Sequence, residues 1–177
     1  MSQDSYQHIY LTGYRGTGKT SVGKILAHRL DRQLVDLDDR VEAAAGKTIR
    51  EIFDEGGEKS FRDWESKCLK LVTSETNGVI ALGGGAILRE SNRDLIASSG
   101  ICFWLDADAA TLAERIFGDQ STHSRRPALS DLDPADEIRH LLAQREPLYR
   151  AVSKHRIETT GKTIDAIAAE IHELLRA

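Results

Sequence analysis

GYRGTGKT, residues Gly13 to Thr20, decides the fold class of this 177-residue chain. The stretch matches the complete phosphate-binding pattern G-x-x-x-x-G-K-[ST], after a short apolar run and before an amphipathic helical pattern. In such a loop, backbone N–H groups and the positive end of the helix dipole converge on phosphate oxygens. A glycine turn without a ligand is the alternative, but the flanking strand and helix favour a nucleotide site. We therefore predict that nucleotide binding involves Gly16, Thr17, Gly18, Lys19, Thr20 and Ser21.

Composition is typical of a globular protein with one domain. Apolar residues make up 40% and charged residues 29% of the sequence, which is ordinary for a folded domain of this length. The net charge of −4 gives no electrostatic reason to expect nucleic acid or an anionic membrane as a partner. The N-terminal MSQDSYQ lacks the apolar segment of a signal peptide, and no apolar run approaches the roughly 20 residues that cross a bilayer. Cys68 and Cys102 match no metal-binding spacing, so we expect reduced thiols in a cytoplasmic protein. A monomer is the default expectation for its oligomeric state.

Apolar runs alternate with helical patterns along the chain. Three runs are typical of buried strands and two are weaker candidates: 9–11, 79–82 and 101–105, then 33–36 and 156–159. Polar residues in capping positions precede several helical patterns: Thr48, Asp108 and Thr163. This alternation predicts an α/β protein with a parallel sheet of about five strands between helical layers, a three-layer αβα sandwich of the P-loop NTPase type. Residues 1–177 form one domain in this interpretation.

Acidic residues follow the second expected strand, in Asp36-Leu37-Asp38-Asp39. If this segment is extended, the side chains of Asp36 and Asp38 share a face close to the phosphate loop. Ligands of open parallel sheets bind beyond the carboxyl ends of the strands. The two carboxylates could bind Mg²⁺ or accept a proton from an attacking hydroxyl. The alternative is that the cluster caps the next helix, which is the role that we expect for Asp39.

Glycines and arginines mark a second part of the expected site. Three glycines, Gly83 to Gly85, follow the third strand and allow the backbone to approach a ligand and donate N–H groups. Arg62 lies early in a helical stretch next to Phe61, and Arg145 lies just before a proline. A lone arginine is usually solvated, yet arginine is the residue suited to forked recognition of a carboxylate or phosphate.

The segment 118–134, GDQSTHSRRPALSDLDP, separates two helical patterns and is too long for an ordinary connection. Segments of this length are often active-site lids, and the adjacent Arg125 and Arg126 favour that interpretation over a disordered surface insertion. We expect a mobile lid over about residues 118–134. His123 lies in the same segment, where a solvated side chain is the simpler expectation.

The motifs together resemble those of the shikimate kinase family, P-loop small-molecule kinases of the nucleoside monophosphate kinase-like type. They run in family order over nearly the whole chain: the phosphate loop, LVDLDD, TIREIFDEGGEKSFR, ALGGGA, SRRPAL and QREPLYR. Very many NTPases share the first motif, whereas the combination of the others is far more specific. The resemblance implies transfer of the γ-phosphoryl group of ATP to the 3-hydroxyl of shikimate with Mg²⁺, in chorismate and aromatic amino acid biosynthesis.

The resemblance also implies roles on the acceptor side, where a helical region over about residues 38–67 binds the substrate. Arg62 and Arg145 match family arginines that bind the shikimate carboxylate. Gly84 matches a backbone contact to the ring, with Gly83 and Gly85 beside it. Asp38 matches the aspartate that binds a substrate hydroxyl and acts as a base or as an orienting group.

On the nucleotide side, the resemblance assigns Thr20 and Asp36 to the metal and Lys19 to phosphate. Arg126 matches the lid arginine that closes over the transferring phosphoryl group, whereas Arg125 has no matching position. Two residues fit the adenine side: Arg115 flanks the base, and Lys162 lies in a loop where family residues vary in type. Leu37, where many relatives have a small polar residue, is a minor departure.

Two other functions are compatible with part of the pattern. A small-molecule kinase for a different polyol or acid, such as gluconate, would use the same phosphate loop and carboxylates. A nucleotide-binding regulatory protein without a transfer reaction would use only the phosphate loop, and it would leave the arginines and carboxylates without a purpose.

Overall fold

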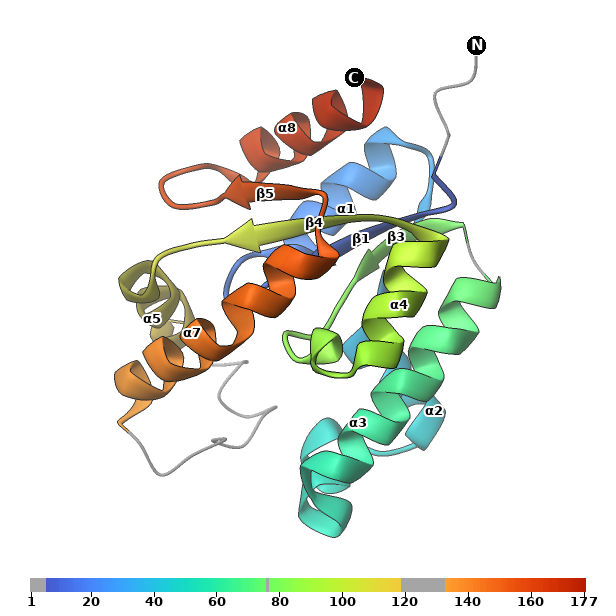
Figure 1. Cartoon of the computed structure of the whole chain (residues 1–177), viewed down its shortest axis with the longest axis vertical. Coiled ribbons are helices and arrows are strands. Elements are labelled where there is room, and N and C mark those ends of the chain that lie inside the picture. Colours follow the sequence, from blue (N-terminus) through green and yellow to red (C-terminus); the bar gives the residue numbers. More distant parts are fainter. Residues whose placement is uncertain (1–5, 76, 119–132) are drawn as a thin grey trace.

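The computed structural model describes residues 6–75, 77–118 and 133–177 and has one parallel sheet between two helical layers (Figure 1). The sheet has five strands in the order β2-β3-β1-β4-β5. All strand pairs are parallel, so the carboxyl ends of the strands share one edge. The strands are β1 (His8–Thr12), β2 (Gln33–Asp36), β3 (Gly78–Ala81), β4 (Gly100–Asp106) and β5 (His155–Glu158). The expected α/β sandwich is confirmed, and each expected strand lies within one residue of an observed one.

Alternate side chains of the strands point into different hydrophobic clusters. Ile9 and Leu11 of β1 pack with α1 (Lys19–Arg29) and α8 (Ile164–Arg176) on one face. Tyr10 of the same strand points to the opposite face. That face is covered by α2 (Leu37–Ala45), α3 (Ile49–Glu75), η1 (Ala86–Leu88), α4 (Glu90–Ser99) and α7 (Pro134–Val152) (Figure 1). A third cluster contains Tyr14 of the phosphate loop, packed where α5 (Ala109–Gly118) meets α7.

Several helix starts have the caps that the sequence predicts. The Thr48 hydroxyl accepts the N–H of Glu51, and a Glu51 carboxylate oxygen accepts the N–H of Thr48 at 2.7 Å. Asp108 accepts the N–H of Thr111 at 2.8 Å ahead of α5. The Thr163 hydroxyl caps α8. These bonds satisfy backbone donors that the first turn of a helix leaves without partners.

The acidic cluster after β2 differs from the expectation in two respects. Helix α2 begins at Leu37, so Asp36 and Asp38 are not successive members of an extended segment and do not share a face in that way. The cap of α2 is Asp36 rather than Asp39, because one Asp36 carboxylate oxygen accepts the N–H groups of Asp38 at 3.0 Å and Asp39 at 3.3 Å. The prediction that Asp39 caps the helix was therefore wrong, and Asp36 has that role in addition to its place beside the phosphate loop.

Two helices contain residues that usually end a helix. Gly57 has φ 68° inside α3 and divides it into two helical parts, so that Arg62 lies early in the second part, as expected. Pro147 lies inside α7, between Arg145 and Tyr149. The expected substrate-binding region over about 38–67 corresponds to α2 and most of α3.

The expected lid falls mainly outside the described residues. Gly118 closes α5 and Asp133 caps α7, while 119–132, with His123, Arg125 and Arg126, lie outside the part that the structure describes.

Among the described residues, no helix is both long and apolar enough to span a membrane. Cys68 and Cys102 are free, in agreement with the expected reduced thiols, and both are buried. Burial raises the pKa of the Cys102 thiol to about 12.

Candidate active site

The phosphate loop surrounds the ammonium group of its own lysine. Lys19 begins α1, directly after the loop that leaves β1, and its Nζ donates to the carbonyl oxygens of Gly13 at 2.8 Å and Tyr14 at 2.9 Å. The Thr17 hydroxyl donates to the same Tyr14 carbonyl at 2.8 Å. A side chain on Gly13 would overlap the Leu105 carbonyl of β4, so the first glycine permits the loop to pass close to the sheet. The loop therefore places a cation at the N-terminus of a helix, where both favour bound phosphate.

Oxygen atoms from two elements meet beside the loop. The Thr20 hydroxyl of α1 donates to Asp36 Oδ2 at 2.6 Å, while Asp36 Oδ1 caps α2. A hydroxyl and a carboxylate are the oxygen ligands that Mg²⁺ prefers, together with water and substrate phosphates. The described residues contain no group of three or more His, Cys, Asp or Glu able to hold a metal by themselves. The pair thus fits a magnesium ion that a nucleotide would share, rather than a cage built by protein alone.

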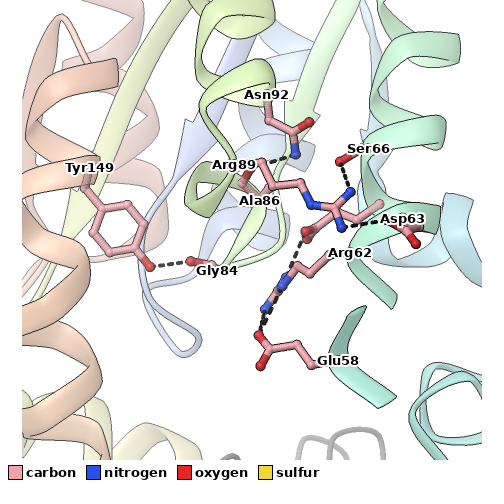
Figure 2. Close-up of polar contacts among 10 residues, drawn as sticks. Glu58, Arg62, Asp63, Ser66, Gly84, Ala86, Arg89, Asn92 and Tyr149 are labelled. Atoms are coloured by element: carbon pink, nitrogen blue, oxygen red, sulfur yellow. Dashed lines mark hydrogen bonds and ion pairs between the residues drawn. The ribbon is translucent and has the colours of Figure 1, made fainter. Parts of the chain in front are cut away.

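The glycine turn after β3 brings the phosphate loop and both arginines together. A β-carbon built on Gly84 would lie 3.4 Å from the Gly13 carbonyl oxygen and 3.7 Å from Arg145 Nη1. A β-carbon on Gly85 would overlap the Arg62 guanidinium. The absence of a side chain at Gly85 lets Arg62 of α3 approach the turn, and Figure 2 shows Arg62 beside it. Arg145 of α7 lies in ordinary contact distance of Gly84.

Arg62 is a buried cation held by two carboxylates of its own helix. Its side chain is only 7% exposed, with Nη1 2.8 Å from Glu65 Oε2 and Nη2 3.1 Å from Glu58 Oε1 (Figure 2). Burial alone would lower the pKa of this guanidinium, but the charges and hydrogen bonds of Glu65 and Glu58 raise it above its usual value. Arg62 therefore carries its positive charge in the folded protein.

Arg145 is held from the other side of the turn. It is 6% exposed, and its guanidinium carbon lies 5.7 Å from the centre of the Tyr14 ring. The neighbouring residue of the loop, Arg15, places Nη2 3.7 Å from Oε1 of the buried Glu137 in the first turn of α7. Both contacts connect α7, which carries Arg145, to the phosphate loop. They hold the expected acceptor side of the site against the nucleotide side.

The two residues expected near adenine have different surroundings. Arg115 of α5 donates from Nη1 to the Gly16 carbonyl at 3.2 Å and to the Thr159 hydroxyl at 3.1 Å, which joins the phosphate loop to the end of β5. Lys162 instead forms an ion pair with Glu170 of α8, with Nζ 2.6 Å from Oε2. The structure thus brings Arg115 against the loop and directs the Lys162 ammonium toward Glu170 of the helix that follows it, α8.

Most of the expected site residues in the described part lie near the edge of the sheet where the parallel strands have their carboxyl ends. Asp38 is half-buried in the first turn of α2 and connects to the loop through Asp36, whereas Ser21 is exposed in the first turn of α1. Sequence reasoning missed the residues that hold the arginines and the turn. Helical spacing could have pointed to the neighbours of the arginines, because Glu65 follows Arg62 by three positions and Tyr149 follows Arg145 by four.

A phosphate loop at the switch point of a parallel sheet, with a hydroxyl–carboxylate pair and two buried arginines beside it, defines a P-loop phosphotransferase of the small-molecule kinase class. The comparisons narrow this class. The sequence pattern of the family described as Shikimate kinase matches residues 15–176. The chain belongs to the shikimate kinase family.

Individual relatives agree with this assignment. The chain is 50% identical to a shikimate kinase of Rhodopirellula baltica over 93% of this chain and 88% of that protein. It is 44% identical to a shikimate kinase of Symbiobacterium thermophilum over 96% of each chain. Among solved structures, shikimate kinase from Acinetobacter baumannii in complex with shikimate has a TM-score of 0.90 and 36% identity, covering 97% of this chain and 94% of that one. Members of the family generally use ATP and Mg²⁺.

Proposed function

We propose that this chain transfers the γ-phosphoryl group of ATP to the 3-hydroxyl of shikimate, giving shikimate 3-phosphate and ADP, in chorismate and aromatic amino acid biosynthesis. The observation that carries the proposal is the pair of buried guanidiniums, Arg62 and Arg145, on either side of the glycine turn opposite the phosphate loop. A buried pair of cations beside a phosphate site suits an acceptor that carries a carboxylate. The shikimate complex of the Acinetobacter relative supports the same acceptor.

On the nucleotide side, ATP would replace the internal partners of Lys19. Its Nζ now donates to two loop carbonyls. When the nucleotide binds, the β- and γ-phosphates would accept these hydrogen bonds instead. Thr20 and Asp36 would hold Mg²⁺, which neutralises phosphate charge when bound. Arg115 would lie beside the adenine, since it already contacts Gly16 and Thr159 at that end of the loop. Because Lys162 is paired with Glu170, it would contribute less than Arg115 to nucleotide binding.

On the acceptor side, each polar group of shikimate would have a partner. Arg62 and Arg145 would bind the carboxylate, and N–H groups of the turn Gly83–Gly85 would bind ring oxygens. Asp38, at the start of α2, would accept a hydrogen bond from the 3-hydroxyl and direct its oxygen at the γ-phosphorus. This arrangement favours an acidic polyol over a neutral one, because a carboxylate gains charge-assisted hydrogen bonds from the two guanidiniums.

In the transfer, the 3-hydroxyl oxygen forms a bond to the γ-phosphorus as the bond to the β–γ bridging oxygen breaks. That oxygen leaves on ADP with the electron pair, and Asp38 receives the hydroxyl proton late in the step. Asp38 therefore orients the hydroxyl more than it deprotonates it. Lys19 stabilises the charge on the transferring group, and Arg126 would do the same from the segment 118–134, which we propose as a closing lid that excludes water.

A coupled assay of ADP release tests the proposed function. We expect Mg²⁺-dependent ADP formation with shikimate and at most trace formation with gluconate at the same concentration. If ATP binds but no acceptor supports turnover, a nucleotide-binding protein without transfer is the better description. Faster turnover with gluconate than with shikimate would assign the acceptor site to a different acid.

A further inference from the structure

Two side chains outside the expected site hold the glycine turn from opposite directions. The Tyr149 hydroxyl of α7 donates to the Gly84 carbonyl at 2.5 Å, and Nδ2 of Asn92 in α4 donates to the Ala86 carbonyl at 2.9 Å. Both bonds are buried, and Figure 2 shows them approaching the turn from its two sides. Buried hydrogen bonds of this kind are costly to leave unmade, so they fix the orientation of the peptide groups that they contact.

Backbone bonds occupy the remaining carbonyls of the turn. The Gly83 carbonyl accepts the N–H of Ala86 at 3.0 Å, and the Gly85 carbonyl accepts the N–H of Leu88 at 3.1 Å. Across residues 6–75, 77–118 and 133–177, no hydrogen bond uses the N–H groups of the three glycines. Every carbonyl from Gly83 to Ala86 therefore already accepts a hydrogen bond, whereas the N–H groups of the three glycines are the donors that the turn can offer a ligand.

The Tyr149 hydroxyl is itself held in place. Its ring is fully buried and stacks on Trp104 of β4, with ring centres 5.9 Å apart. Burial raises the pKa of the hydroxyl to about 12, although the charge and hydrogen bond of Arg145 lower it. The hydroxyl thus remains a donor at physiological pH, and it lies beside the cation that we assign to the acceptor carboxylate.

We infer that Tyr149 and Asn92 are positioning residues for phosphoryl transfer, because they lock the Gly83–Gly85 turn in the orientation that presents its N–H groups to the acceptor. Glycine has the conformational freedom for a peptide to rotate, and a rotated Gly84 peptide would present a carbonyl oxygen to the acceptor oxygens instead. Because Tyr149 and Arg145 lie on the same helix, the bond from Tyr149 to Gly84 also holds the turn in a fixed position relative to Arg145. This inference rests on the proposed acceptor site.

Tyr149→Phe tests the inference because it removes the hydroxyl and keeps the stacked ring. We expect the KM for shikimate to rise roughly fivefold, the effect of one lost hydrogen bond, with the KM for ATP nearly unchanged. Tyr10→Phe is the matched control: Tyr10 is also fully buried, and its hydroxyl lies 2.6 Å from Ser99 Oγ in α4. We expect Tyr10→Phe to lower the melting temperature without changing either KM.

Asn92→Ala tests the other support without removing a contact to Arg145. We expect the same selective rise in the KM for shikimate. A KM for shikimate like that of the wild type in a folded Tyr149→Phe or Asn92→Ala protein would overturn the inference and leave the proposed function intact. So would equal rises in the Tyr10→Phe control. Wild-type protein without shikimate-dependent ADP formation would overturn the proposed function, and the inference with it.

Discussion

The nucleotide side and the acceptor side of this molecule bind charge by different means. On the nucleotide side, one contiguous loop supplies backbone donors and Lys19 at the start of α1. On the acceptor side, two buried guanidiniums come from helices far apart in the sequence, and each depends on neighbours for its position. Arg62 has Glu65 and Glu58, and Arg145 lies on the Tyr14 ring.

This difference predicts how each side tolerates substitution. The loop binds phosphate through backbone donors and Lys19, so a change at Lys19 should remove a specific interaction with phosphate and leave the rest of the site intact. The acceptor side is held by packing of buried charges, so a change there should alter both acceptor affinity and stability. The following variants test whether the two sides behave in these separate ways.

The largest effect is expected on the nucleotide side, from Lys19→Ala. Without the ammonium group, charge on the transferring phosphoryl loses a direct partner, and we expect kcat to fall about a thousandfold. Lys24→Ala is the matched control, since Lys24 is exposed on the same helix. Steady-state rates of ADP release measure both, and a comparable loss in Lys24→Ala would show that the effect comes from α1 rather than from phosphate contact.

Asp38→Asn is expected to lower kcat about a hundredfold, because the amide cannot accept the hydroxyl proton and orients the hydroxyl poorly. The fold should be retained, since the cap of α2 is the side chain of Asp36. Asp39→Asn, one residue further in the same turn and exposed, should have nearly wild-type kcat. Circular dichroism alongside the kinetics decides the point: an unfolded Asp38→Asn would mean that the cluster is structural.

Of the two substrates, Arg62→Leu should affect only the acceptor, while the loss of the partner of buried Glu65 should also lower stability. We expect the KM for shikimate to rise about thirtyfold, equivalent to ~2 kcal/mol for a lost charge-assisted hydrogen bond, with the KM for ATP changed less than about twofold. Arg89→Leu serves as the control, because Arg89 forms a nearby ion pair with Asp63 instead, 2.6 Å between Nη2 and Oδ1 (Figure 2). Similar changes in both variants would argue against direct contact between Arg62 and the carboxylate.

Gly85→Ala tests the close approach of backbone and cation. The added methyl group would displace the Arg62 guanidinium, and we expect roughly a tenfold rise in the KM for shikimate. Gly46→Ala is a control for stability: Gly46 has φ 64° and open space around it, so the variant should be destabilised without contact to the site. An unchanged KM in Gly85→Ala would mean that Arg62 can move without loss of binding.

The smallest effect is expected for Lys162→Ala. Its ammonium is paired with Glu170, and an exposed pair of this kind contributes little. The KM for ATP should remain within about twofold of the wild type. A larger rise would show that Lys162 leaves Glu170 to contact the nucleotide, as the family resemblance implies for the adenine side.

Much of the fold followed from local sequence patterns. The phosphate loop motif gave the position of β1 and α1, and apolar runs gave the other four strands within one residue. Capping positions at Thr48, Asp108 and Thr163 were also correct, because a cap depends on residues only a few positions apart. The acceptor arginines came from their match to family motifs, since spacing alone does not distinguish a buried arginine from a solvated one.

Features that depend on three-dimensional packing were not accessible in this way. Whether Asp36 or Asp39 caps α2 depends on the residue at which the helix begins, and the pattern left that boundary open. The contacts of Tyr149 with Gly84 and of Asn92 with Ala86 join different elements. No periodicity within one segment predicts such contacts, although the four-residue step from Arg145 to Tyr149 places both on one side of α7.

The burial of Arg62 has a consequence for engineering this protein. The Arg62 guanidinium and the Glu65 carboxylate are removed from water and stabilise a fold less than apolar side chains of similar volume would, so this part of α3 is a favourable place to gain thermal stability. The same replacements would remove the counter-charge for the acceptor. Thermostabilised variants obtained by selection for folding alone should therefore accumulate changes at Arg62 and Glu65 and lose activity, whereas selection with shikimate present should preserve both residues.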